Sequence, residues 1–171
     1  PLPTTVGHLR TSTFEDYVSD SDMSADGIWQ TGVNFNAFLR RSGATPTSST
    51  GPNSAHSGGY YIYCESAYGD YENFDLQTNE LPGGVVNISF FYYAYGTYIG
   101  TMRIQVGDGS ANSWKWTTIW SRSGNQGQTW YWASVSVPLD EKYVRFYYTG
   151  YASSGSSIYP YGDFALDDVT I

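Results

Sequence analysis

The chain is poor in the residues on which several protein classes depend. Its single cysteine, Cys64, allows no disulfide within the 171 residues. Only 14% of the residues are charged, yet no apolar run approaches the roughly 20 residues of a membrane-spanning helix, so we expect no membrane insertion. Long stretches of the helix-favouring residues Ala, Leu, Glu and Lys are also scarce. These shortages argue against disulfide-rich, membrane-spanning and helical classes.

Basic residues are scarce as well. Lys and Arg total 8 against 16 Asp and Glu, which gives a formal net charge of −8. Proteins that bind nucleic acid need a basic surface to neutralise phosphates, so nucleic acid is not an expected partner. A surplus of carboxylates is compatible with cation binding, although it commonly serves solubility alone.

Aromatic residues and glycine are abundant. The chain has 17 Tyr, 6 Trp, 8 Phe and 19 Gly, a composition typical of strands and turns. Alternating apolar residues predict extended segments, of which 87–95 and 101–106 are expected to be neighbours. The predicted segments are 27–38, 59–65, 87–95, 101–106, 114–120, 131–139, 143–148 and 164–171. Short strands at this spacing predict an all-β sandwich or jelly roll.

The alternation also assigns side chains to faces of the sheets. Val135, Val137 and Leu139 share one face and are expected in the core, as are Val144 and Phe146. The opposite faces carry rings and hydrogen-bonding groups, which suit a glycan or a protein partner equally well. Burial of both faces, one of them under long loops, is an open alternative. The candidate ligand-binding residues are Trp130, Trp132, Tyr143, Arg145 and Tyr147.

Catalytic and zinc-binding patterns are weak. Cys64 follows the alternating Tyr61-Ile62-Tyr63, which predicts a buried, inert thiol. The two histidines, His8 and His56, lie far apart and neither has an orienting acid close in sequence. Glycoside hydrolysis needs two carboxylates at a defined distance, which could be drawn for example from Glu65 and 70–72, but this distance cannot be read from the sequence. We therefore expect a protein that is not an enzyme.

Acidic residues next to apolar ones mark both ends of the chain. Glu15 follows Phe14, and Asp167-Asp168 lie in the final predicted strand. First and last strands of an antiparallel sandwich often lie side by side, so these carboxylates can converge on Ca²⁺, which prefers oxygen ligands. Alternate residues of a strand point to the same face, so Asp168 is expected to point inward with Phe164 and to be the ligand, with Asp167 as the alternative. The loop 51–57 could add carbonyl or hydroxyl oxygens.

Several motifs in order along the chain resemble the MAM domain, the adhesion module of meprin, neuropilin and receptor phosphatase mu. They are Thr13-Phe14-Glu15, Trp29-Gln30, the aromatic-x-x-aromatic-x-Arg segment 35–40, the Thr-Pro and Thr-Gly-Pro loop 45–52, His56-Ser57-Gly58-Gly59-Tyr60-Tyr61, Phe90-Phe91-Tyr92 with Gly100-Thr101-Met102 as a central hairpin, Ile119-Trp120, Gly127 with Trp130, and Ala165-Leu166-Asp167-Asp168-Val169.

The resemblance implies a two-sheet antiparallel jelly-roll sandwich, concanavalin-like, in one domain over residues 1–171. The abrupt start at Pro1 and the strand-like end at 169–171 suggest a domain excised from a larger secreted protein. The resemblance also implies a calcium-stabilised, non-catalytic adhesion or recognition module, secreted or at the cell surface. Its partner would be a protein or glycan, with self-association possible. The alternative is a carbohydrate-binding module on a polysaccharide-degrading enzyme or a secreted protease.

The chain departs from the family pattern in two places. The paired cysteines of vertebrate members are missing, which implies a bacterial, disulfide-free relative. The acid that precedes the family histidine is Ala55 here, so a loop carbonyl, water or Asn53 would have to replace that ligand. The metal ligands that the pattern and the resemblance together imply are Glu15, Asn53, His56, Asp167 and Asp168.

Overall fold

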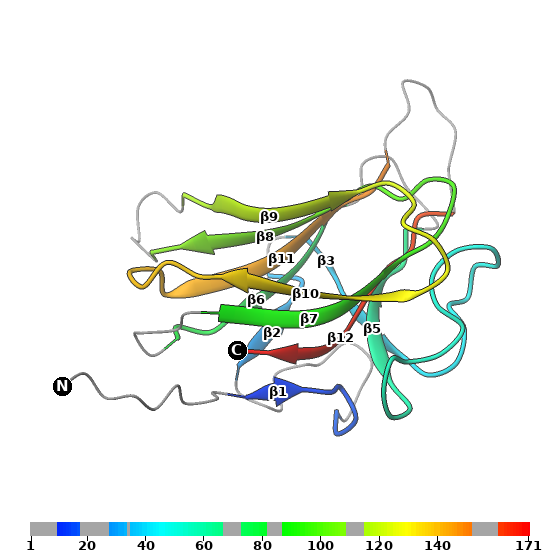
Figure 1. Cartoon of the computed structure of the whole chain (residues 1–171), viewed down its shortest axis with the longest axis horizontal. Coiled ribbons are helices and arrows are strands. Elements are labelled where there is room, and N and C mark those ends of the chain that lie inside the picture. The colour runs from blue at the N-terminus through cyan, green and yellow to red at the C-terminus, as the bar shows by residue number, and fades with distance from the viewer. Residues whose placement is uncertain are drawn as a thin grey trace.

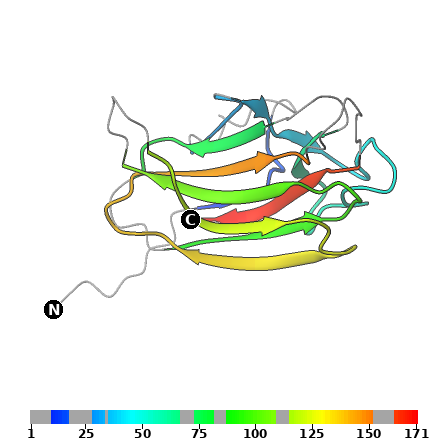
Figure 2. The ribbon, with the colours of Figure 1, turned by 90° about the horizontal axis from the view of Figure 1, so that it is seen from above.

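The computed structural model describes residues 10–17, 28–33, 35–66, 73–81, 87–108, 115–151 and 161–171. In these ranges the chain forms strands β1 to β12, arranged in two six-stranded sheets. Figures 1 and 2 show the two sheets stacked as layers of a sandwich. This architecture confirms the predicted all-β jelly roll. Within the described ranges the chain has no helix that is long and apolar enough to cross a membrane.

The first sheet holds both ends of the described chain. Its order is β10-β7-β12-β5-β4, and β1 pairs antiparallel with β12. All of its pairings are antiparallel. The bounds are β1 Thr11–Ser12, β4 Leu39–Arg41, β5 Tyr61–Cys64, β7 Asn87–Ala94, β10 Trp130–Ser136 and β12 Phe164–Thr170.

The second sheet has the order β2-β6-β11-β8-β9. The short strand β3 joins it by pairing in parallel with β6, while the other pairings are antiparallel. The bounds are β2 Trp29–Thr31, β3 Asn36–Ala37, β6 Asn73–Thr78, β8 Thr101–Gly107, β9 Thr117–Ser123 and β11 Tyr143–Thr149.

The sequence-based strand assignments need several corrections. β7 and β8 are not neighbours: they belong to different sheets, because the segment 95–100 carries the chain from one layer to the other. Close packing along this crossing requires glycine, since a Cβ at Gly100 would lie 1.9 Å from the Thr149 carbonyl oxygen. The predicted segment 27–38 contains two short strands, and β1, β4 and β6 were not predicted. Residues 8, 27, 70–72 and 114 lie outside the described ranges.

The core lies between the sheets. It includes Val135, Val137, Val144 and Phe146, which confirms their predicted inward positions. Leu139 is 63% exposed and not in the core, because β10 ends at Ser136 and Leu139 lies in the turn that follows. Cys64 is buried with a free thiol, as predicted.

A second, smaller cluster lies on the outer face of the first sheet. Tyr61, Tyr63, Tyr93 and Ala165 are buried there, and Ala55 of the loop 42–57 packs against them. The loop is also tied down by a hydrogen bond from the Tyr61 hydroxyl to the Gly43 carbonyl, at 2.9 Å. The alternative in which a long loop buries one outer face therefore holds for this part of the first sheet.

Candidate functional site

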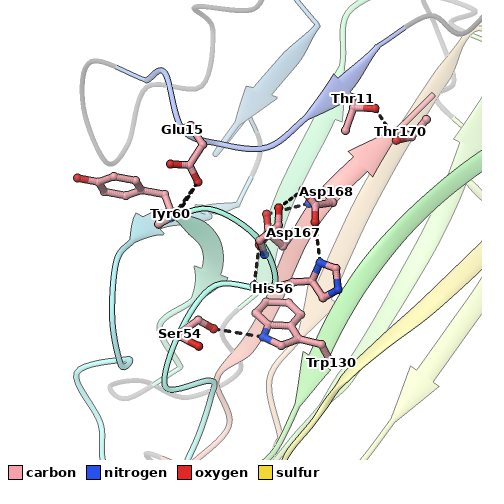
Figure 3. Close-up of polar contacts among 11 residues, drawn as sticks. Thr11, Glu15, Ser54, His56, Tyr60, Trp130, Asp167, Asp168 and Thr170 are labelled. Atoms are coloured by element: carbon pink, nitrogen blue, oxygen red, sulfur yellow. Dashed lines mark hydrogen bonds and ion pairs between the residues drawn. The ribbon is translucent and has the colours of Figure 1, made fainter.

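The two ends of the described chain meet, as the sequence predicts. Thr11 pairs with Thr170 and Ser12 with Val169 in the β1–β12 ladder, and the Thr11 and Thr170 hydroxyls lie 2.8 Å apart. Figure 3 shows this pair beside the acidic residues. The first and last strands thus bring Glu15, Asp167 and Asp168 to one end of the first sheet.

Glu15 binds the backbone of the loop that precedes β5. Its Oε1 accepts hydrogen bonds from the N–H groups of Gly59 and Tyr60, both at 2.9 Å (Figure 3). Gly58 approaches the same carboxylate so closely that a Cβ there would lie 2.3 Å from Oε1. Glu15 therefore joins the segment after β1 to this loop.

Arg40 holds the segment that carries Glu15. Its Nε donates to the Phe14 carbonyl and its Nη2 to the Glu15 carbonyl, both at 2.6 Å. Its guanidinium also lies 3.3 Å from the centroid of the Tyr60 ring. These contacts stabilise Phe14 at a φ of 61°, an unfavourable value for a residue other than glycine. The sequence placed Arg40 in a family motif but gave it no role.

Asp167 is completely buried and binds the same loop. Its Oδ2 accepts from the N–H groups of His56 and Ser57 at 2.9 and 3.2 Å, and its Oδ1 accepts from the Asp168 N–H at 2.8 Å. Burial, and secondarily the negative charge of Asp168, raise the pKa of Asp167 to about 7, although the backbone hydrogen bonds oppose the shift.

Asp168 does not point inward, contrary to the parity argument. It has a φ of 48°, and the pairing of β12 with β7 shifts register between Asp167 and Thr170. This bulge allows Val169 to take the core position instead. The Asp168 carboxylate faces the loop, where Oδ2 lies 2.6 Å from His56 Nδ1 and Oδ1 accepts from the Ser57 hydroxyl at 2.7 Å.

We call Glu15, Arg40, the loop 56–60, Asp167 and Asp168 the head–tail junction. Its carboxylate oxygens are the donor type that a hard cation prefers. Glu15 nevertheless binds residues 59 and 60, whereas the two aspartates bind 56 and 57. Consequently no three His, Cys, Asp or Glu side chains of the described ranges gather around one point.

The remaining predicted ligands add little to this set. Asn53 is exposed and makes no hydrogen bond to these carboxylates in the described structure. His56 directs its Nδ1 to Asp168, and its ring stacks on Phe91 with centroids 3.4 Å apart. The junction as described is thus held together by hydrogen bonds, and any bound cation would need loop carbonyls or water in addition to the carboxylates.

The five predicted ligand-binding residues do not form one surface. Trp130 and Trp132 lie on the outer face of the first sheet, whereas Tyr143, Arg145 and Tyr147 lie on the outer face of the second. A single ligand cannot span both faces, because the core separates them. The outward orientation predicted for these five residues was correct, but sequence alone did not show that β10 and β11 belong to different sheets.

Trp130 and Trp132 also differ from each other. The Trp130 indole N–H donates to the Ser54 carbonyl at 3.2 Å (Figure 3). Its ring packs edge-on against Tyr61 and Tyr93. Trp132 is 62% exposed. Trp130 therefore holds the loop 42–57, and Trp132 is the more accessible ring of the pair.

A family model described as "MAM domain, meprin/A5/mu" matches residues 14–171. The chain belongs to the MAM domain family. Neuropilin-1a of Danio rerio is 31% identical over 140 residues, which cover 77% of this chain and 14% of neuropilin-1a. Thyroid hormone-induced protein B of Xenopus laevis is 29% identical over 165 residues, covering 92% of this chain and 22% of that protein. This MAM domain thus spans a small part of each of these relatives.

Solved structures share the fold of this MAM domain. The K2 cleaved adhesin domain of Lys-gingipain aligns with a TM-score of 0.65 at 18% identity, over 94% of this chain and 97% of that one. The CBM22-1 xylan-binding domain of Paenibacillus barcinonensis Xyn10C aligns with a TM-score of 0.58 at 10% identity, over 96% and 92%. At these identities the likeness establishes the jelly roll alone.

Proposed function

We propose that this MAM domain is a non-catalytic adhesion or recognition module of a secreted or cell-surface multidomain protein. Its relatives include MAM domain-containing glycosylphosphatidylinositol anchor protein 2 of Homo sapiens, 31% identical over 142 residues, which cover 73% of this chain and 14% of that protein. An anchor of that type places a protein at the outer cell surface. The fold neighbours include an adhesin domain and xylan-binding domains.

The observation that carries the proposal is the difference between the two outer faces. The loop 42–57 packs on the first sheet and buries part of its aromatic face. On the outer face of the second sheet, Tyr147 and Gln105 are partly exposed, and both are held by contacts with the more buried Arg145. Preorganised rings and hydrogen-bonding groups lower the entropy cost of binding a ligand.

Glycan binding is the second candidate within this function. The outward side chains of the second sheet are mostly amides, hydroxyls, guanidinium groups and rings, which together match sugar hydroxyls and sugar ring faces. The xylan-binding fold neighbour has a TM-score of 0.58. A protein partner would use the same rings and arginines in a different way.

Adhesion of beads coated with the chain tests the proposed function. We expect the beads to adhere to cells or matrix, whereas beads coated with denatured chain do not. Adhesion that glycosidase treatment of the cells abolishes would identify a glycan, and adhesion that survives it would identify a protein. Clumping of beads without cells would indicate self-association. No adhesion to any cell, matrix or glycan surface would refute the function.

We further propose that calcium stabilises the head–tail junction. Glu15, Asp167 and Asp168 supply carboxylate oxygens, and the loop around Asn53 and His56 supplies carbonyl oxygens. The buried position of Asp167 next to Asp168 supports the proposal, because two crowded carboxylates gain from a nearby cation. When bound, calcium would neutralise this charge, and the chain's own residues would continue to hold the loop.

A further inference from the structure

The outer face of the second sheet carries a continuous row of polar side chains. Strand register places Gln30 opposite Gln77, Gln77 opposite Arg145, Arg145 opposite Gln105, and Gln105 opposite Thr118. One residue from each of the five strands thus contributes to the row. Neighbouring strands lie about 4.8 Å apart, so the row places hydrogen-bonding groups at regular intervals across the sheet. Gln77 and Arg145 are each 8% exposed, and the other members of the row are more accessible.

Arg145 occupies the centre of this row and is firmly positioned. Its guanidinium carbon lies 4.2 Å from the Trp116 ring centroid and 4.8 Å from that of Tyr147. Its Nε donates to Gln105 Oε1 at 2.8 Å, and Gln105 Nε2 donates onward to Thr118 Oγ1 at 3.1 Å. Arg145 is only 8% exposed, so packing rather than solvent determines its orientation.

These contacts use one edge of the guanidinium. The terminal amino groups Nη1 and Nη2 of Arg145 make no hydrogen bond or ion pair with the described residues. Two parallel N–H donors held in a plane match the two oxygens of a carboxylate. The guanidinium therefore lies in the centre of the sheet with its carboxylate-binding donors unused.

The adjacent row contains a second arginine and one acid. In that row Asp75 pairs with Tyr147, Tyr147 with Arg103, and Arg103 with Ser121. Asp75 is completely buried, and its Oδ1 accepts the Val33 N–H at 2.9 Å. Burial lowers the pKa of Arg145, and the negative charge of Asp75 opposes that shift. Two of the chain's 8 basic residues thus lie close together on this face although the chain carries a net charge of −8.

We propose that this face binds a glycan that contains uronate units, with Arg145 binding a carboxylate and Gln77 and Gln105 binding hydroxyls. A glycan fits better than an acidic peptide, because amides and hydroxyls dominate the row. Phe35, whose ring lies 5.1 Å from that of Tyr147, extends the surface on which a sugar ring stacks. The inference rests on the proposed recognition function and specifies its ligand class and face.

Binding to polygalacturonate, alginate and hyaluronan, each compared with its carboxyl-reduced form, tests this inference. We expect at least one acidic polymer to bind, its reduced form to bind about tenfold more weakly or worse, and sodium chloride to weaken the interaction. Arg145→Gln should lower affinity by about tenfold or more, and Arg145→Lys should restore part of it. Trp132→Ala, on the opposite face, should bind like the unchanged chain.

Other outcomes would overturn the inference in distinguishable ways. Equal binding of reduced polymers would refute the acidic class. Loss of binding in Trp132→Ala but not in folded Arg145→Gln would place the site on the first sheet. Binding of poly-glutamate as strong as that of the polysaccharides would identify a peptide-binding face. Adhesion of coated beads without binding to any of these polymers would refute the uronate ligand while leaving the recognition function intact.

Discussion

His56 and Asp168 lie 112 positions apart in the chain, yet His56 Nδ1 is 2.6 Å from Asp168 Oδ2. The bulge in β12 makes this contact possible, because it turns Asp168 away from the core and towards the loop. Asp167 binds the backbone N–H of the same histidine. The last strand therefore holds the loop through two successive carboxylates. Because Glu15 and Arg40 also contact this loop, the stability of the head–tail junction should depend on those two residues as well.

Gly58→Ala should destabilise the domain through its contact with Glu15. Gly58 has a φ of 61°, and the added Cβ would collide with Glu15 Oε1. We expect the free energy of unfolding to fall by about 2–5 kcal/mol, from the left-handed backbone and the clash together. Gly43→Ala is a matched control, because Gly43 has a φ of 71° with open space around it. If urea denaturation shows that Gly58→Ala and Gly43→Ala lose the same free energy of unfolding, the contact between Gly58 and Glu15 does not contribute to stability.

Arg40→Lys should also weaken the junction. Lysine cannot reproduce the two hydrogen bonds to the carbonyls of Phe14 and Glu15, and it loses the planar contact with Tyr60. The expected loss of unfolding free energy is about 1.5–3 kcal/mol. The adjacent Arg41→Lys serves as the control, since Arg41 donates to the Ala44 carbonyl on the surface. If both variants unfold at the same urea concentration, Arg40 has no special role.

The sequence predicted the sandwich well because its longer strands alternate strictly. β7, β10, β11 and β12 begin and end within three residues of their predicted segments. It also predicted that the first and last strands lie side by side, as they do in the β1–β12 pair, although the Glu15, Asp167 and Asp168 side chains do not gather around one point in the described ranges. It could not predict the strand partners, because alternation fixes which face a side chain occupies but not which sheet a strand joins.

Local irregularities explain the remaining errors. The bulge at Asp168 switches the faces of the sheet on which the following side chains of β12 lie. Nothing in the sequence Leu166-Asp167-Asp168-Val169 indicates this bulge. Short strands such as β1 and β4 have too few residues to show a period. The contact of Trp116 with Arg145 comes from a residue just before β9 and follows from tertiary packing alone.

Trp130 and Trp132 should differ in their effect on stability although they lie two residues apart on one face. Trp130→Ala removes the ring that packs on Tyr61 and Tyr93 and the hydrogen bond to Ser54. We expect it to cost about 2–4 kcal/mol, whereas Trp132→Ala should change stability by about 0.5 kcal/mol or less. Thermal and urea unfolding of both variants measure the difference. A large loss for Trp132→Ala would show that its exposed ring has a partner in the folded chain.

Asp163 should make stability fall as the pH rises. It is completely buried, and burial together with the negative charge of Glu65 raises its pKa from 3.8 to about 7, although the Ser66 N–H opposes the shift. Between pH 4 and 7 the folded state therefore keeps a proton that the unfolded state releases. In that range this residue lowers the free energy of unfolding by up to about 1.4 kcal/mol per pH unit.

Asp163→Asn tests this dependence. The amide retains an oxygen for the Ser66 N–H and cannot ionise, so urea unfolding at pH 5 and pH 7.5 in the presence of chelator should show a smaller difference than in the unchanged chain. Asp167, whose pKa is also raised to about 7, keeps part of the slope in this variant. An identical pH dependence in both proteins would show that Asp163 titrates alike in the folded and unfolded states.

Calcium should raise the melting temperature of the domain, because a ligand that binds only the folded state stabilises it by RT ln(1 + [L]/Kd), about 2.7 kcal/mol at 100 times Kd. The increase should be larger at pH 8 than at pH 6, since calcium binds the ionised form of Asp167, whose pKa is about 7 in the folded chain. Glu15→Gln should reduce the calcium effect while keeping an oxygen acceptor for Gly59 and Tyr60. Magnesium, which demands a tighter octahedral geometry, should have less effect. Identical melting in calcium and in chelator at both pH values would show that the hydrogen bonds of Glu15, Asp167 and Asp168 hold the head–tail junction without a metal.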